Sequence, residues 1–166
     1  MGRVYTVIGE NLTLGTGSVL VALQSAATVS AGAIIRPLRV EVSQNGTLTS
    51  NNVRLLFSTR DTAGTLTTTS VTATNNVLGG PASGLSGNTS VIGGTARIGI
   101  NSSADSGGAY TNHWAFAPNV LSGYLYLPVP EERITIPAST VWCARFAAAP
   151  GTTTGWAITF VYEEII

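Results

Sequence analysis

The chain has 166 residues, about the size of one ordinary domain, so we expect residues 1–166 to form a single domain with its own core. Only 10% of the residues are charged, against roughly 25% in a typical globular chain, and eight arginines balance eight carboxylates to a formal net charge of zero. This balance excludes the basic surface of a protein that binds nucleic acid or anionic lipid, and near-zero net charge favours association.

The N-terminal third alternates apolar and polar residues with a period of two and is rich in Val, Ile and Thr, a pattern typical of strands. The predicted strands are residues 4–8, 18–23 and 38–42. Asn45-Gly46 follows the third of them, and this dipeptide accepts the positive φ angles of a type I′ turn. We therefore expect a hairpin that returns through Leu48 or through residues 53–57.

Residues 61–113 differ from the rest of the chain, because they are dense in Thr, Ser, Gly and Asn and carry only Asp61, Arg97 and Asp105 as charges. Short apolar groups recur along the segment, which argues against a disordered linker. A structureless loop of this length is also uncommon inside a compact domain. We expect short strands joined by wide loops, or an extended arm ordered by a neighbouring molecule.

The C-terminal third has the clearest strand pattern. Strands are predicted at residues 124–127, 133–136, 140–146 and 157–162, with turn residues between them. The longest apolar stretches are strand-sized, so no membrane span is expected. Many short strands and no helical period predict an all-β fold, a jelly-roll-like antiparallel β-sandwich with long Gly/Thr-rich loops.

Few residues are suited to catalysis. His113 is the single histidine, and no Gly-x-Ser-x-Gly motif accompanies it. Cys143 lies in an apolar run beside Trp142 and is expected to be buried and inert, and Trp142 and Trp156 are expected in the core. A zinc site draws on several His or Cys residues at short spacing, which this chain lacks. The sequence therefore predicts a protein that is not an enzyme, with no catalytic residue, no cofactor and no metal.

Two carboxylate pairs, Glu131-Glu132 and Glu163-Glu164, are the remaining candidates for acid and base chemistry. Adjacent residues on a strand point to opposite faces, so neither pair is arranged as a general acid with a general base. We expect solvated strand ends, with Arg133 or Arg145 as ion-pair partners.

Candidate interface residues gather in two places. Tyr110, His113, Trp114 and Phe116 end the polar segment, and Trp and Tyr are enriched at interface hot spots. The chain ends supply Val4, Tyr5, Ile165 and Ile166. Both ends are expected to pair with neighbouring elements, in the same chain or on another subunit. Deleting residues 163–166 is expected to weaken assembly more than folding.

Several short phrases of the sequence resemble a known class of proteins. They are residues 39–42, 53–56, 62–65, 132–137, 142–146, 148–150 and 161–164. Their layout is similar to that of bacteriophage head decoration, or cement, proteins. The resemblance implies a jelly-roll-like sandwich, a homo-oligomer with a trimer favoured, and the major capsid protein as partner. It also implies localisation on the virion surface after synthesis in the host cytoplasm.

The expected function is therefore that of a non-enzymatic virion structural protein, which stabilises the head by binding across capsid subunits. One alternative is a carbohydrate-binding β-sandwich, a receptor-binding or adhesin domain that uses Trp114 and Tyr110 as a stacking platform. A third is a jelly-roll subunit of the shell itself, because shell and decoration proteins need the same strands and apolar contacts.

Overall fold

The computed structural model describes residues 2–13, 19–24, 34–45, 50–60, 65–70, 72–81, 83, 97–106, 109–137, 140–148, 150–151 and 154–165. Nearly all regular structure in these residues is strand. The elements are β1 (Arg3–Leu12), β2 (Val19–Gln24), β3 (Ile34–Gln44), β4 (Leu55–Arg60), β5 (Thr65–Ser70), β6 (Thr74–Asn75), β7 (Arg97–Ser106), β8 (Thr111–Phe116), β9 (Tyr124–Tyr126), the 3₁₀ turn η1 (Pro130–Glu132), β10 (Val141–Phe146) and β11 (Trp156–Ile165). No helix among the described residues is long and apolar enough to span a membrane.

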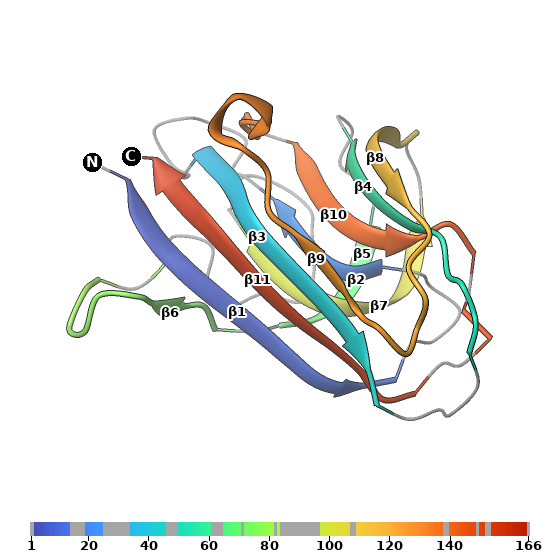
Figure 1. Cartoon of the computed structure of the whole chain (residues 1–166). Coiled ribbons are helices and arrows are strands. Elements are labelled where there is room, and N and C mark those ends of the chain that lie inside the picture. Colours follow the sequence, from blue (N-terminus) through green and yellow to red (C-terminus); the bar gives the residue numbers. More distant parts are fainter. Residues whose placement is uncertain are drawn as a thin grey trace.

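The strands form two antiparallel sheets packed face to face, which confirms the predicted β-sandwich (Figure 1). One sheet has five strands in the order β6-β1-β11-β3-β9, and the other has six in the order β5-β7-β2-β10-β4-β8. Within them, β1-β11-β3-β9 faces β2-β10-β4-β8, and the chain alternates between these two groups at every step except from β4 to β8. This alternation is the strand arrangement of a jelly roll.

Aromatic side chains from both sheets fill the space between them. Trp142 on β10 stacks on Phe160 on β11 with 4.9 Å between ring centroids, and Phe146 meets Trp156 at 4.7 Å. These four side chains are buried, as is Cys143, so the predicted burial of Trp142, Trp156 and Cys143 is confirmed. Burying an apolar side chain of this size contributes about 1.5–3 kcal/mol, and these rings therefore hold the two sheets together.

The predicted hairpin after Asn45 is wrong. β3 pairs with β11 and β9 in the five-stranded sheet, whereas β4 pairs with β10 and β8 in the other. The chain therefore crosses from one sheet to the other after β3. Leu48 itself lies outside the described residues. Alternation along β3 marks it as a strand but does not identify its neighbours, which are contributed by residues more than 80 positions away.

Two other expectations are changed in part. The strand predicted at residues 133–136 is reduced to a single bridge between Ile136 and Ile35. The described parts of residues 61–113 contain β5, β6, β7 and the start of β8. Short strands in this segment are thus confirmed where it is described.

The two chain ends pair with each other inside the five-stranded sheet. β1 runs antiparallel to β11 from the Arg3–Glu164 pair onward, and β11 pairs on its other side with β3 as far as Ile165 and Ile34. The expectation that the ends pair with neighbouring elements is confirmed within one chain. Because β11 is a central strand paired on both sides, deleting residues 163–166 is expected to cost folding stability as well, and the expected effect on assembly stays a prediction.

Candidate functional site

A β-bulge in the edge strand β8 divides its side chains between the two faces of the six-stranded sheet. Phe57 on β4 pairs with Trp114, but the next β4 residue, Ser58, pairs with Asn112, so His113 is the extra residue. Trp114 packs against the core, whereas Asn112 contacts Ser58 on the outer face. Bulges re-aim side chains in this way, and here one creates two different surfaces along a single short strand.

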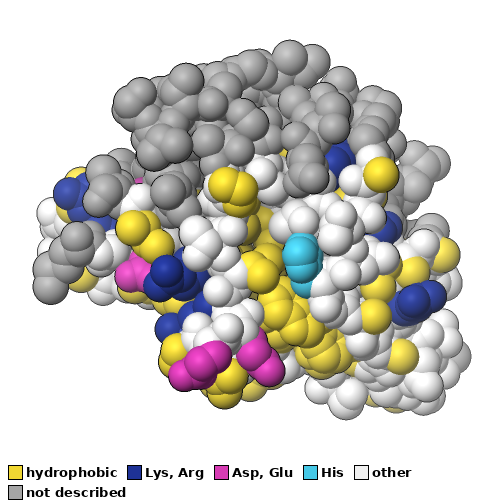
Figure 2. All heavy atoms as spheres, turned by 90° about the horizontal axis from the view of Figure 1, so that it is seen from above, with side chains coloured by type: hydrophobic (Ala, Val, Ile, Leu, Met, Phe, Trp, Pro, Cys, Tyr) yellow, Lys and Arg dark blue, Asp and Glu magenta, His cyan; other side chains and the backbone are white. Residues whose placement is uncertain are grey.

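The inward side chains of β8 form an aromatic cluster at the open edge between the sheets. Trp114 lies 5.2 Å from Tyr126 and Phe116 lies 4.6 Å from Tyr124, measured between ring centroids. Burial, and to a lesser degree the carboxylate of Glu132, raises the pKa of Tyr126 to about 12, so its hydroxyl stays protonated at neutral pH. Figure 2 looks onto this edge and shows a stripe of hydrophobic side chains between the histidine and the acidic residues.

A row of exposed apolar side chains follows the neighbouring edge strand. Leu125 is 55% exposed, Leu127 64% and Val129 54%. They alternate with the buried Tyr126 and Pro128, so the inward side chains anchor the segment and the outward ones meet solvent. These three residues are called the β9 apolar row. Among the described strands, β9 pairs only with β3, so it is an edge strand of the five-stranded sheet, and an edge strand can pair with another chain.

The outward side of β8 contributes to a second surface, built around Arg145 on β10. Arg145 Nε donates to Ser58 Oγ at 3.1 Å, and its Nη2 donates to Asn112 Oδ1 at 3.1 Å. Ser58 Oγ in turn donates to Asn112 Oδ1 at 2.8 Å. The Arg145 guanidinium lies 4.2 Å from the centroid of the Tyr110 ring, a cation–π contact. Neutral groups therefore fix the position of this cation.

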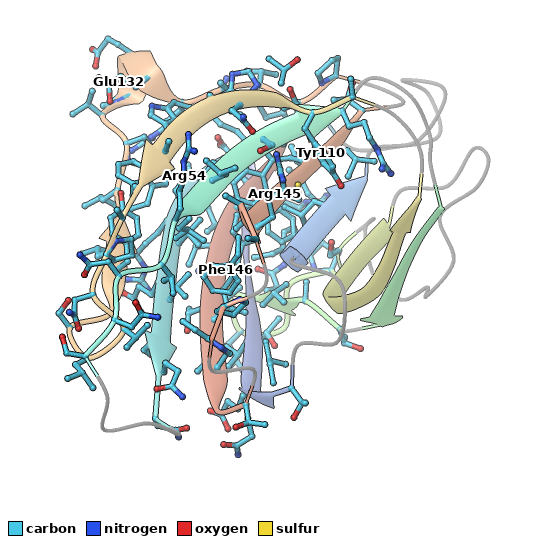
Figure 3. The ribbon with its side chains drawn as sticks, turned by 90° about the vertical axis from the view of Figure 1, so that its right-hand side faces the viewer. Arg54, Tyr110, Glu132, Arg145 and Phe146 are labelled. Carbon is cyan, nitrogen blue, oxygen red and sulfur yellow. The ribbon has the colours of Figure 1, made fainter. Side chains whose placement is uncertain are left out.

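Two further arginines flank Arg145 on the same face. The guanidinium of Arg60 lies 5.3 Å from the Tyr110 ring centroid and is almost fully buried. Arg54 alternates with the buried Val53 and Leu55 and is exposed. Figure 3 shows Arg54, Arg145 and Tyr110 on the face of the six-stranded sheet that is turned to the viewer. The surface formed by Arg54, Arg145, Tyr110, Ser58 and Asn112 is called the arginine site.

The carboxylates whose side chains the structure describes all lie elsewhere. They are Glu10, Glu41, Glu163 and Glu164 in the five-stranded sheet, and Glu131 and Glu132 in η1. On the five-stranded sheet, Arg36 pairs with Glu163 at 3.5 Å and Arg39 with Glu41 at 3.5 Å. No carboxylate among the described side chains forms an ion pair with Arg54 or Arg145. Among the side chains that the structure describes, the charges are thus unevenly distributed between the two faces.

Glu163 and Glu164 do point to opposite faces, but only one is at the surface. Glu164 is fully buried, where it accepts a hydrogen bond from Ser83 Oγ, and Ser83 also shares a hydrogen bond of 2.7 Å with the Tyr162 hydroxyl. Burial raises the pKa of Tyr162 above its usual range. The expectation of solvated strand ends paired with Arg133 or Arg145 is therefore wrong for Glu164, and Glu163 pairs with Arg36 instead.

The remaining interface candidates at the chain ends lie apart from both surfaces. Val4 lines a pocket of about 590 Å³ between the start of β1 and the β6 turn. Tyr5 is fully buried, stacks on Tyr162 with 5.8 Å between centroids, and donates a hydrogen bond to Pro81 O, so its ring belongs to the core. Ile165 is half-buried at the end of β11, and Ile166 lies outside the described residues.

Of the polar-segment candidates, the structure brings Trp114, Phe116 and His113 together and separates Tyr110 from them. His113 is exposed, and its Nε2 lies 2.7 Å from Thr59 Oγ1. Tyr110 lies on the opposite face of the sheet, where Arg145 covers its ring. The stacking platform of Trp114 with Tyr110 is therefore not assembled. No pattern in the sequence indicates the arginine site, because the bulge that turns Asn112 outward has no local signature.

Among the described residues, no group of three His, Cys, Asp or Glu side chains is placed to hold a metal ion. What the two surfaces can do is bind: the β9 apolar row offers apolar area and the arginine site offers fixed hydrogen-bond donors. Comparisons of the chain with protein-family models, with curated proteins and with solved structures each give no significant match.

Proposed function

We propose that the chain is a non-enzymatic structural protein of a virion, a decoration or cement module that binds across subunits of a bacteriophage capsid. The observation that supports this most directly is the β9 apolar row, in which Leu125, Leu127 and Val129 are each more than half exposed on an edge strand. Rows of this kind on an open edge are suited to docking against another chain.

The proposed action is mechanical. Each copy lays the β9 apolar row over neighbouring shell subunits, and burying one such side chain completely contributes about 1.5–3 kcal/mol. The packed aromatic rings below the row, Trp114 on Tyr126 and Phe116 on Tyr124, hold it in one shape. A rigid surface loses little conformational entropy on binding, which favours affinity.

The test is co-sedimentation of the purified chain with shells assembled from the major capsid protein of the same virus. The chain is expected to pellet with the shells, and Leu125→Ser with Leu127→Ser is expected to leave it in the supernatant. Leu78→Ser is the matched control, because Leu78 is fully exposed on a different part of the surface. A wild-type chain that stays in the supernatant contradicts the proposal.

The jelly-roll strand order also supports a second candidate, a subunit of the shell itself, because jelly rolls occur in viral capsid proteins as well as in lectins. This support is an analogy at the level of the fold. The two candidates differ in one measurement. A shell subunit is expected to form closed particles by itself in the electron microscope, whereas a decoration protein is expected to stay as small oligomers.

A further inference from the structure

We infer that the arginine site of one copy binds the exposed acidic turn, Glu131 and Glu132, of a second copy of this chain. The inference rests on the proposed function in that both require the chain to act by docking protein surfaces. It adds which surfaces meet when copies associate.

The arginine site offers hydrogen-bond donors in a fixed position, as binding a carboxylate requires. A guanidinium has five N–H donors, and the hydrogen bonds of Arg145 use Nε and one N–H of Nη2. Its Nη1 forms no hydrogen bond with any residue that the structure describes. Because Ser58, Asn112 and the Tyr110 ring already hold the side chain, a partner carboxylate binds without the cost of ordering it.

A second cation lies within reach of the same partner. Leu56 pairs with Arg145 across β4 and β10, so Arg54 is the diagonal neighbour of Arg145. Diagonal neighbours on one face of a sheet lie roughly 7–8 Å apart. On the same face of the six-stranded sheet, Val141 and Cys143 at the start of β10 are fully buried. Arg54 is exposed and Arg145 is partly exposed, so the accessible part of this face lies around these two arginines.

The acidic turn has the complementary properties. Glu131 and Glu132 are exposed and form an ion pair with no arginine among the described residues, and the Nε of the adjacent Arg133 donates to Pro128 O instead. The turn is a 3₁₀ element that begins at Pro130 and is closed by the Glu132 N to Val129 O hydrogen bond of 2.9 Å. Two carboxylates are therefore presented on a fixed piece of backbone.

The acidic turn directly follows the β9 apolar row, so the two form one continuous surface from Leu125 to Glu132. In Figure 3, Glu132 lies at a corner of the molecule separate from Arg145 and Tyr110. A contact between two different patches is heterologous, and such a contact closes into a ring when the rotation per copy allows it. A trimer is the smallest ring above a dimer and matches the oligomer that the resemblance to decoration proteins implies.

The test is a charge-reversal cycle read by light scattering on a sizing column across micromolar concentrations. The wild type is expected to form a discrete oligomer that weakens with added salt. Arg145→Glu alone, or Glu131→Arg with Glu132→Arg alone, is expected to weaken association by roughly 30-fold or more. All three substitutions in one chain are expected to restore it. Circular dichroism and thermal unfolding check that each variant is folded.

Glu10→Arg is the matched control, because Glu10 is an exposed carboxylate on β1, at the other side of the five-stranded sheet. It is expected to leave the oligomer unchanged. If Arg145→Glu does not fold, Arg54→Glu, on an exposed side chain, replaces it in the cycle. A monomeric wild type, or combined reversals that fail to restore a folded oligomer, overturns the inference. Co-sedimentation of the same chain with shells still supports the proposed function, so the two failures are distinguishable.

Discussion

The arginines on the outer faces of the two sheets have different kinds of partner. On the five-stranded sheet, Arg36 and Arg39 each pair with a glutamate of the same face at 3.5 Å. On the six-stranded sheet, Arg145 is held by a serine, an asparagine and a tyrosine ring. A chain with zero net charge can therefore have one face whose arginines pair with carboxylates and another whose arginine is ordered by neutral groups. Net charge alone does not reveal this difference.

The largest loss of stability is expected from a deletion in the five-stranded sheet. Deleting residues 163–166 removes the end of a central strand that pairs with both β1 and β3, together with the buried Glu164. We expect the free energy of unfolding to fall by about 4–5 kcal/mol or more. Urea unfolding followed by tryptophan fluorescence measures this loss. A truncated chain with unchanged unfolding but lost self-association would support the assembly role expected from the sequence.

A smaller loss of stability is expected on replacing Glu164, the buried carboxylate of the five-stranded sheet. Glu164→Ala removes the buried carboxylate oxygen that accepts from Ser83, and losing a buried hydrogen bond of this kind costs about 1–3 kcal/mol. Glu163→Ala is the neighbouring control, because Glu163 is partly exposed and its ion pair with Arg36 contributes about 0–1 kcal/mol. Urea unfolding of both variants makes the comparison, and equal losses for the two would show that burial of Glu164 does not matter.

On the six-stranded side, the corresponding change is Asn112→Ala. It removes the oxygen that accepts from both Ser58 and Arg145, and we expect the protein to lose about 1 kcal/mol of stability. Self-association is expected to weaken as well, because Arg145 is then less fixed. Thr111→Ala, on the next exposed residue of β8, is the control for both thermal unfolding and light scattering. Identical behaviour of the two variants would contradict a positioning role for Asn112.

The smallest effect concerns the aromatic edge between the faces and appears only at high pH. The pKa of Tyr126 is raised to about 12, chiefly by burial, from an ordinary value near 10. The unfolded chain therefore loses this proton first, so stability is unaffected below about pH 10 and falls as the pH rises toward 12. Thermal unfolding at pH 9 and pH 11 should show a smaller loss for Tyr126→Phe than for the wild type. An equal loss in both would argue against the shift.

Local sequence pattern was sufficient to predict most strands and part of the core. Alternation with a period of two marked β3 and β11 as strands, and the apolar run in β10 marked Trp142 and Cys143 as buried. Many short strands without a helical period predicted a sandwich. These features depend only on neighbours along the chain.

Tertiary structure alone decided how the strands are combined and which side chains meet. Pairing between distant segments placed β3 and β4 in different sheets and buried Glu164 near the end of the central strand β11. By simple alternation Asn112 shares a face with Trp114. The bulge at His113, set by the register with β4, turns Asn112 to the outer face beside Arg145. A shift of one residue in the register between two strands moves every side chain to the opposite face of the sheet. The register therefore depends on contacts with the neighbouring strand, which lies far away in the sequence.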